Sequence, residues 1–488
     1  MNEIVVVGSG FGGIAAALRA RSLGFNVTIV EKLNSLGGRA QVFKKDGFVF
    51  DSGPTVITAP HLFDELFILF DKKRSDYIDL ISLDVWYQFI FNDLSKFNYG
   101  GTLEDIQNEI SKISAQDALN YKNLLEESKK IFKVGFSQLA HRPFHSFFEM
   151  FKLLPTMIKL KSYRSVFSLV SSHMEHDKLR QAFSIQPLLV GGNPFNTTSI
   201  YSLIHFLEFK DGIHFARGGM GQLVSALIKL MKEEGIKIYT DTKLEKIIFE
   251  KKKISRIQTN KGVIKCDHLI SNTDPEYFYS QFVKKNTIKV NLRRKFYKKS
   301  MGLFVLYFGT RKVYENIEHH TIILGKHYKK LLEQIFKHKK LSEEISIYLH
   351  RPTATDKSMA PEGCDSFYAL VPVPNLEANY NWERKGVELK DLVIKRLSET
   401  IMPNLSEHIE TIFWKTPKDF KDDYCSPSGT GFSIAPLFYQ SAWFRYHNKG
   451  EGIDNLSFVG AGTHPGAGLP GVLSSAKVTE SLLKNKYL

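Results

Sequence analysis

The first 39 residues hold the pattern that most constrains this chain. Ile4 to Val7 are four β-branched residues, which predict a buried parallel strand, and a glycine-rich turn from Gly8 to Gly13 follows directly. Gly8 permits a sharp turn, Gly10 lets a pyrophosphate approach the backbone, and Gly13 lets the next helix pack on the strand. The N-terminus of that helix then points at the anion. An ordinary tight turn is the alternative, but the flanking strand and helix favour a dinucleotide-binding unit.

An acidic residue at the end of a second predicted strand supports this interpretation. Val27 to Val30 predict that strand, and Glu31 lies 18 residues after Gly13. A carboxylate at this place accepts hydrogen bonds from a ribose diol. Because it repels a ribose 2′-phosphate, we expect a cofactor other than NADP. Gly37, Gly38 and Arg39 then add backbone without side chains and a guanidinium that binds phosphate oxygens.

A second glycine-rich loop lies near the C-terminus. Leu456 to Val459 predict a last buried strand, and the 12 residues from Gly460 to Gly471 include five glycines before a helix of small residues. We expect Gly462 and a helix start at Gly471 and Val472 to bring backbone N–H groups to a ligand and to stabilise negative charge there. A glycine-rich surface loop is the alternative.

Composition limits the partners of the chain. Its 488 residues suit two or three domains, and it carries a net charge of +15 and 37 phenylalanines. Phe-rich segments beside lysines favour anionic lipid, so we expect no nucleic acid partner. A genome rich in AT would also raise the Lys and Phe content. The three cysteines are too far apart for a metal or redox pair, and we expect no metal.

Residues 102–185 differ from the rest, because they are Lys-rich and show few strand signals. The apolar residues recur there at steps of three and four, at Phe144, Phe147, Phe148, Phe151, Leu154 and Ile158, and Lys152 lies beside them. This stripe predicts either a helix packed on its own core or a helix in the membrane interface. No apolar run reaches the roughly 18 residues that could span a bilayer. We therefore expect a cytoplasmic protein, peripheral on the inner face of the cell membrane.

Both ends and several interior segments resemble the bacterial phytoene desaturases, carotenoid-forming flavoproteins of the amine oxidase superfamily. The interior segments that carry the resemblance are Asp51 to Thr55, Leu179 to Phe183, Leu188 to Phe195, Ser199 to Tyr201, Phe304 to Gly309, Ala360 to Cys364 and Gln440 to Arg445. The resemblance implies FAD as the cofactor. It places the FAD pyrophosphate at the glycine turn, Gly38 and Arg39, the adenine at the backbone of Leu244, and the isoalloxazine ring against Gly53, Pro54 and Thr55.

We expect an α/β fold with three parts. A Rossmann-like FAD-binding domain takes residues 1–85, 215–290 and 445–488, and a mixed-sheet substrate-binding domain takes residues 86–101, 186–214 and 291–444. Residues 102–185 form an inserted helical domain that associates with the membrane.

The implied activity is desaturation of a lipid-soluble C40 polyene, from 15-cis-phytoene to all-trans-lycopene, with oxygen or a quinone as the electron acceptor. A C30 diapophytoene desaturase or a hydroxycarotenoid 3,4-desaturase is an alternative, since chain length depends on the depth of the substrate tunnel. A lipid escort protein on the same fold would lack intact flavin loops. An amine oxidase would need an aromatic cage.

Glu149 is the candidate proton acceptor. Some relatives carry an Arg-Asp pair where this chain has Phe148 and Glu149, and an acid/base role has been proposed for that Asp. The alternative is that Glu149 belongs to the solvated face of the Phe-rich helix.

Overall fold

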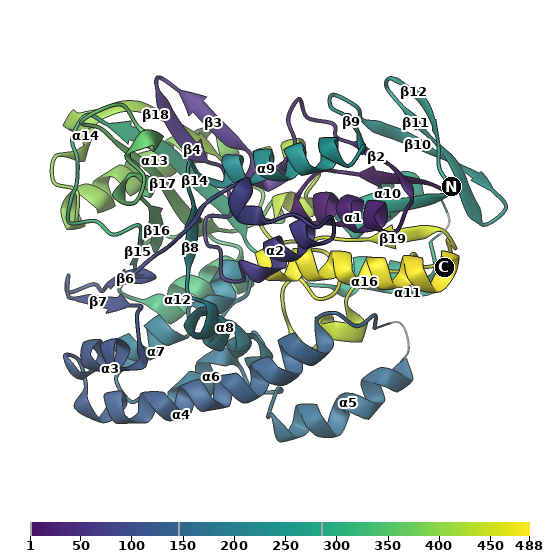
Figure 1. The fold of residues 1–488 in the computed structure, drawn as a ribbon. Helices are drawn as coiled ribbons and strands as arrows, with labels where there is room; N and C mark the ends of the chain where they lie inside the picture. The colour runs from purple at the N-terminus through teal and green to yellow at the C-terminus, as the bar shows by residue number, and fades with distance from the viewer. Residues whose placement is uncertain (1, 145–146, 285) are drawn as a thin grey trace.

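A five-stranded parallel sheet brings the two ends of the chain together (Figure 1). The computed structural model describes residues 2–144, 147–284 and 286–488, without the side chains of Phe147, Glu149 and Phe151. The strand order is β19-β13-β1-β2-β9. These strands are β1 (Glu3–Val7), β2 (Asn26–Val30), β9 (Lys237–Tyr239), β13 (His268–Ser271) and β19 (Leu456–Phe458). Because all five run parallel, the loops after β1, β13 and β19 meet at one edge of the sheet.

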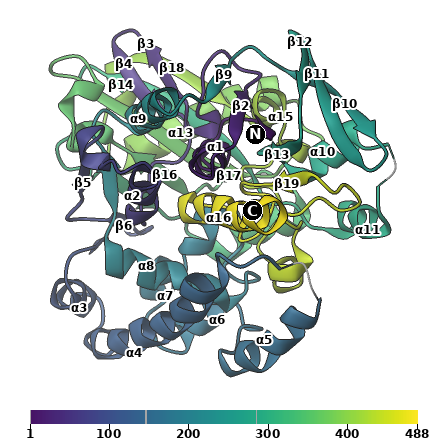
Figure 2. The same ribbon diagram turned by 45° about the vertical axis from the view of Figure 1, so that its right-hand side comes forward.

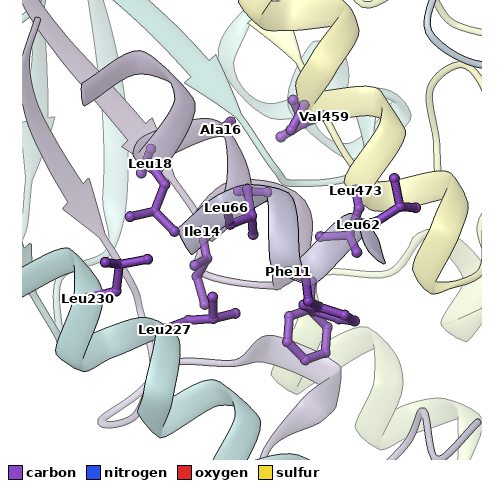
Figure 3. Packing of buried hydrophobic residues seen from close by; sticks show 14 of the residues in the cluster. Phe11, Ile14, Ala16, Leu18, Leu62, Leu66, Leu227, Leu230, Val459 and Leu473 are labelled. Carbon is purple, nitrogen blue, oxygen red and sulfur yellow. The ribbon is translucent and has the colours of Figure 1, made fainter. Parts of the chain in front are cut away.

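Helices from distant parts of the chain cover this sheet. They include α1 (Phe11–Ser22), α2 (His61–Ile68), α9 (Met220–Glu233) and α16 (Leu469–Tyr487). Helix α1 is buried over residues 11–20, and its alanines let the neighbouring helices come close. Figure 3 shows Phe11 and Ile14 of α1 among leucines of the other three helices, Leu62, Leu66, Leu227, Leu230 and Leu473. The predicted βαβ unit is confirmed, and its helix is the centre of the largest core.

A seven-stranded mixed sheet forms the second layer, with strands from residues 87–99 and 302–415. Its order is β18-β14-β17-β16-β15-β6-β7, and β15 and β6 are its parallel pair. The strands are β6 (Tyr87–Ile90), β7 (Lys96–Tyr99), β14 (Gly302–Thr310), β15 (His320–Ile323), β16 (Ile347–His350), β17 (Asp365–Val373) and β18 (Ile409–Lys415). Helix α13 (Trp382–Thr400) packs on one face of this sheet through Leu389, Val393 and Leu397. The other helices between or after its strands in the sequence are α12 (Tyr328–Glu333), α14 (Leu405–His408) and α15 (Pro417–Tyr424).

Smaller elements connect these layers. A hairpin joins β3 (Val42–Lys45) to β4 (Phe48–Asp51), and its turn residues Asp46 and Gly47 both have a positive φ, 52° and 83°, as a two-residue type I′ turn requires. The other small sheets pair β5 (Leu80–Ser82) with β8 (His214–Ala216), and β10 (Leu244–Glu250) with β11 (Lys253–Thr259) and β12 (Gly262–Lys265). Helices α10 (Pro275–Phe282) and α11 (Ile288–Phe296) follow β13.

Helices form a third layer below the sheets in Figures 1 and 2. They are α3 (Leu103–Ser111), α4 (Ala115–Phe132), α5 (Phe147–Lys159), α6 (Val166–Ser171), α7 (Asp177–Phe183) and α8 (Leu203–Asp211). The helical character predicted for residues 102–185 is confirmed, and α8 from outside this range packs against α4. In the described part of the chain, no helix combines the length and apolar character that a membrane crossing needs.

Candidate active site

One cavity of about 540 Å³ extends from the edge of the parallel sheet into the interior. At the sheet edge its walls are the predicted glycine loops. Farther in, the walls are apolar residues of α5, α8 and the mixed sheet, including Met150, Leu153, Met157, Leu203, Leu207, Ile322 and Leu324. The two glycine loops lie against each other, since a Cβ placed on Gly12 would be 3.1 Å from the backbone N of Gly460. The cavity therefore suits a ligand whose polar end lies at the glycine loops, with a second, apolar molecule bound beside it farther in.

The first loop needs its glycines for two different reasons. Gly8 has a φ of +91°, in the left-handed region that favours glycine. A Cβ on Gly13 would lie 2.1 Å from the carbonyl oxygen of Gly8, so α1 can start here only without a side chain. Glu31 lies buried beside this turn, and its Oε2 accepts hydrogen bonds from Ser9 N (2.9 Å) and Ser9 Oγ (2.7 Å). Glu31 thus shapes the loop in addition to lining the cavity.

Asn272 completes the loop from a neighbouring strand, and the sequence reasoning did not single it out. It follows β13 and lines the cavity. Its Nδ2 lies 2.8 Å from the place of a Cβ on Gly10. Gly10 therefore makes room for this amide as well as for a ligand. The parallel pairing of β13 with β1 puts Asn272 here, so its position follows from the strand order and not from a local sequence pattern.

Arg39 offers a buried donor at the polar end of the cavity. Gly37 and Gly38 before it have φ of 113° and 57°. Its Nη2 donates to Ser426 Oγ (3.3 Å), while its buried Nε has no partner among the described residues. Burial lowers the pKa of Arg39, and Asp274 opposes this. An unpartnered cationic N–H beside a glycine turn fits a phosphate oxygen, so the residues present fit a pyrophosphate.

The C-terminal loop differs from its prediction at the helix start. Helix α16 begins at Leu469, before the predicted Gly471 and Val472. Val472 N donates to the Gly468 carbonyl (3.0 Å), so the helix itself uses this amide. In the first turn, the backbone N–H groups of Leu469 and Gly471 have no acceptor within the helix. The start is earlier because Pro470, which has no N–H, fits the first turn of a helix.

Two further predicted positions are packed tightly and line the cavity. A Cβ on Gly462 would lie 2.4 Å from Pro275 Cδ, and one on Gly471 would lie 2.5 Å from the Gly466 carbonyl oxygen. Leu244, at the start of β10, lines the sheet-edge end of the cavity. The structure thus brings all three to the same cavity as the first loop.

Gly53, Pro54 and Thr55 line the cavity between the hairpin and the mixed sheet. Tyr368 OH donates to the Gly53 carbonyl (3.2 Å), and Thr55 Oγ1 lies 2.6 Å from Tyr348 OH. These bonds fix the loop against β16 and β17.

A buried histidine cluster continues from Tyr348. Tyr348 OH lies 2.8 Å from His320 Nδ1, and the rings of His319 and His350 contact His320. Burial lowers the pKa of all three histidines well below the usual value, so they are neutral at pH 7. His350 Nε2 lies 3.1 Å from His319 Nε2, and His319 Nδ1 lies 2.6 Å from Thr355 Oγ1, so the cluster is a hydrogen-bonded support behind Thr55.

A carboxylate lies in the apolar part of the cavity, and no sequence pattern singled it out. Glu208 of α8 is 0% exposed and lines the cavity. Its Oε1 accepts a hydrogen bond from Tyr87 OH (3.2 Å), and its Oε2 accepts one from Gln186 Nε2 (3.4 Å). Burial raises the pKa of Glu208 to about 8.

The predicted Glu149 belongs to α5, but its side chain lies outside the described residues. The described side chains show that α5 has two apolar faces. Met150, Leu153 and Met157 line the cavity, whereas Phe148 and Ile158 are 63% and 57% exposed. One apolar face of α5 therefore borders the cavity, and another is exposed at the surface.

Residues 11–479 match the family described as flavin containing amine oxidoreductase. A lycopene-forming phytoene desaturase of Pantoea ananas is 40% identical over 487 residues, 99% of either chain. A 4,4'-diapophytoene desaturase of Methylomonas sp is 29% identical over 493 residues, 99% of this chain and 96% of that protein. An oxidoreductase of Methanosarcina mazei has a TM-score of 0.66 at 15% identity over 98% of this chain and 100% of that one, a likeness of fold. With its glycine loops and unpartnered Arg39 Nε around one cavity, the chain belongs to the flavin-containing amine oxidoreductase family.

Proposed function

We propose that this protein is an FAD-dependent carotenoid desaturase that converts 15-cis-phytoene to all-trans-lycopene. The observation that carries the proposal is the continuity of the cavity from the glycine loops to an apolar interior. A C40 hydrocarbon offers no hydrogen-bonding group, so apolar walls must recognise it by shape. The 40% identity over the full length with a lycopene-forming phytoene desaturase supports this substrate.

Different residues around the cavity bind FAD, align the substrate and exclude water. Bound FAD supplies the acceptor for a hydride from an unactivated carbon. The groups proposed to hold it are Gly8, Gly10, Gly13, Gly38 and Arg39 at the pyrophosphate, Glu31 at the ribose, Leu244 at the adenine and Gly53, Pro54 and Thr55 at the isoalloxazine ring. Gly462, Gly471 and Val472 line the side where the N-terminus of α16 stabilises negative charge. The walls align the substrate and exclude water. Oxygen or a quinone is the proposed final electron acceptor.

Expression in a bacterium that accumulates phytoene tests the activity. We expect the extracted pigment to be red lycopene, identified by its absorption spectrum. The same expression in a strain that accumulates C30 diapophytoene is the comparison, because a C30 enzyme would colour only that strain. Unchanged colourless phytoene would contradict the proposal, and a purified protein without flavin would favour an escort protein.

We propose that the protein takes its substrate from the cytoplasmic face of a membrane, through a surface formed by α5 and α11. On α5, Phe148 and Ile158 are exposed beside Lys152 and Lys159, and the opposite face of the helix lines the cavity. An exposed apolar face beside basic residues suits an anionic lipid surface. The predicted helical domain, residues 102–185, then contributes α5 both to the membrane contact and to the cavity wall.

Helix α11 extends the same surface. Ile288, Leu292 and Phe296 lie one turn apart and are 78%, 50% and 63% exposed, and Lys289, Arg294 and Lys295 are exposed among them. The turn Ala442–Phe444 joins the two helices, since Arg293 Nε donates to the Phe444 carbonyl (3.0 Å) and α5 contacts the same turn. In Figure 2, α11 and α5 lie on the same side of the molecule. Ala442 also lines the cavity, which therefore reaches this surface.

Replacing exposed rings and aliphatic groups by serine should release the protein from vesicles. We expect Phe148→Ser with Ile158→Ser, and separately Ile288→Ser with Phe296→Ser, each to lower co-sedimentation with anionic liposomes at least about tenfold, since each lost side chain removes roughly 1.5 kcal/mol or more of apolar burial. Leu119→Ser on α4 is the matched control, because Leu119 is exposed away from this surface. Wild-type sedimentation of the first double variant refutes the α5 contact, and that of the second refutes α11 alone.

A further inference from the structure

We propose that Glu208 accepts the proton that the substrate loses in each dehydrogenation. The inference rests on the proposed desaturation and assigns a catalytic residue to it. Glu208 is fully buried, and it lines the cavity beside the apolar residues Leu203, Ile204 and Leu207 of its own helix. A buried carboxylate in the wall of a hydrocarbon cavity is costly, so its presence calls for a chemical role.

The other carboxylates that line the cavity in the described residues have structural partners near the nucleotide end. Glu31 binds Ser9, Asp274 accepts from Glu276 N (2.9 Å), and Asp423 pairs with Lys415. Glu208 instead has two neutral donors, Tyr87 OH and Gln186 Nε2, and forms no ion pair within the part of the chain described. It is therefore free to change its charge during a reaction.

The groups that face Glu208 from the surrounding elements are also neutral at pH 7. Tyr87 of β6, Tyr99 of β7 and Tyr121 of α4 have raised pKa values because they are buried. Burial lowers the pKa of His205, on the same helix, to about 3. An ionised Glu208 would thus face no positive charge until a cation forms on the substrate. That cation would stabilise the carboxylate, and the carboxylate would stabilise the cation.

A chain of side-chain contacts connects Glu208 to the residues proposed to face the flavin. Thr55 contacts Tyr348 OH, and Tyr348 OH contacts His320 Nδ1. The rings of His320 and Tyr87 lie 5.9 Å apart between centroids, and Tyr87 OH reaches Glu208. A series of contacting side chains therefore connects the carboxylate to the region where the reaction is proposed to occur.

One C–H bond of the saturated pair breaks with transfer of a hydride to the flavin, which is the oxidant. The C–H bond on the adjacent carbon then breaks, its electron pair forms the new C=C bond, and its proton moves to a carboxylate oxygen of Glu208. The proton returns to solvent before the next dehydrogenation.

The variant Glu208→Gln, assayed as holoenzyme with phytoene in detergent, tests the role directly. We expect the rate of substrate-dependent flavin reduction to fall roughly 10²-fold or more, because the amide has no basicity and proton acceptors contribute about 10²- to 10⁴-fold. Glu175→Gln, an exposed position in the helical layer, is the control. Flavin content and thermal unfolding should match the wild type, which separates chemistry from misfolding.

The pH profile supplies a readout that a structural role would not move. A base acts when ionised, and with a pKa of about 8 its ionised fraction grows from about a tenth at pH 7 to about nine tenths at pH 9. The wild-type rate should therefore rise about tenfold over this range, and the Gln variant should show no such rise. Tyr87→Phe removes a donor to the ionised form and should move the rise to higher pH.

An infrared spectrum of the protein without substrate tests the titration itself. We expect a protonated carboxyl band that declines between pH 7 and 9 in the wild type. In Glu208→Gln the decline should be smaller, because only the part contributed by groups such as the buried Asp51, whose pKa is raised to about 7, remains. Wild-type rates in Glu208→Gln would overturn the proposal, and so would a loss of rate confined to Glu149→Gln. If the wild type leaves phytoene unchanged, the proposed function fails first.

Discussion

Gly13→Ala is expected to leave the protein almost without FAD. The added Cβ would lie 2.1 Å from the Gly8 carbonyl oxygen, and both atoms belong to backbone that cannot rotate away. Either α1 or the strand end must shift, which costs at least the roughly 1–3 kcal/mol typical of overpacked cores. Because the same turn forms the pyrophosphate site, we expect FAD affinity to fall about a hundredfold or more. Flavin absorbance per chain and a thermal unfolding curve measure the two effects.

Gly24→Asn is the matched control for this variant. Gly24 has a positive φ, +87°, and no atom of the described residues lies within 4 Å of its Cβ position. Asn tolerates the left-handed conformation better than other residues with a side chain, so this change should preserve flavin content. A Gly13→Ala protein with wild-type flavin content would show that the turn does not hold the cofactor.

The N-terminal unit could be predicted because its signals are local. A β-branched run, a glycine turn and an acidic residue at the second strand end occur within the first 31 residues. In each case the residue type is set by the backbone conformation or the burial at that position. The predicted start of α16, at Gly471 and Val472, is too late in the sequence, because glycines and Pro470 fit either a loop or a first helical turn. Boundaries of this kind depend on hydrogen bonds that the residue types do not specify.

Asn272, Tyr348 and Glu208 could not be located from local patterns. Asn272 reaches the first loop through the pairing of β13 with β1, and Tyr348 reaches Thr55 through the mixed sheet. Glu208 meets Tyr87 because α8 packs beneath β6. Each contact joins segments that are distant in the sequence, so it follows from strand order and layer packing rather than from spacing.

The two faces of α5 show a different limit. The stripe of apolar residues predicted a buried or a membrane-facing helix, but the same apolar pattern contains both buried and exposed side chains. Phe144 and Met150 are buried, while Phe148 and Ile158 are exposed. Phe147 and Phe151, also part of that stripe, have side chains outside the described residues. Hydrophobicity alone does not distinguish a cavity wall from a lipid contact.

Leu153→Asp should stop desaturation while FAD stays bound. Leu153 lines the cavity from α5, on the route from the proposed membrane surface to the interior. A hydrocarbon that passes a short, buried carboxylate must desolvate it, at a cost of several kcal/mol, and aspartate is too short to reach solvent as a lysine would. Since about 1.4 kcal/mol is a tenfold change in rate, we expect at least roughly a hundredfold loss of flavin reduction by phytoene in detergent.

Leu154→Asp places the same charge on the neighbouring residue, which is 39% exposed on the outer side of α5. In detergent this protein should reduce its flavin at the wild-type rate, although its binding to anionic liposomes should weaken because the new charge repels the headgroups. Equal loss of rate in the two variants would mean that α5 acts through its stability. A wild-type rate in Leu153→Asp would mean that the polyene enters elsewhere, and the contact between α5 and the cavity would then have no part in substrate delivery.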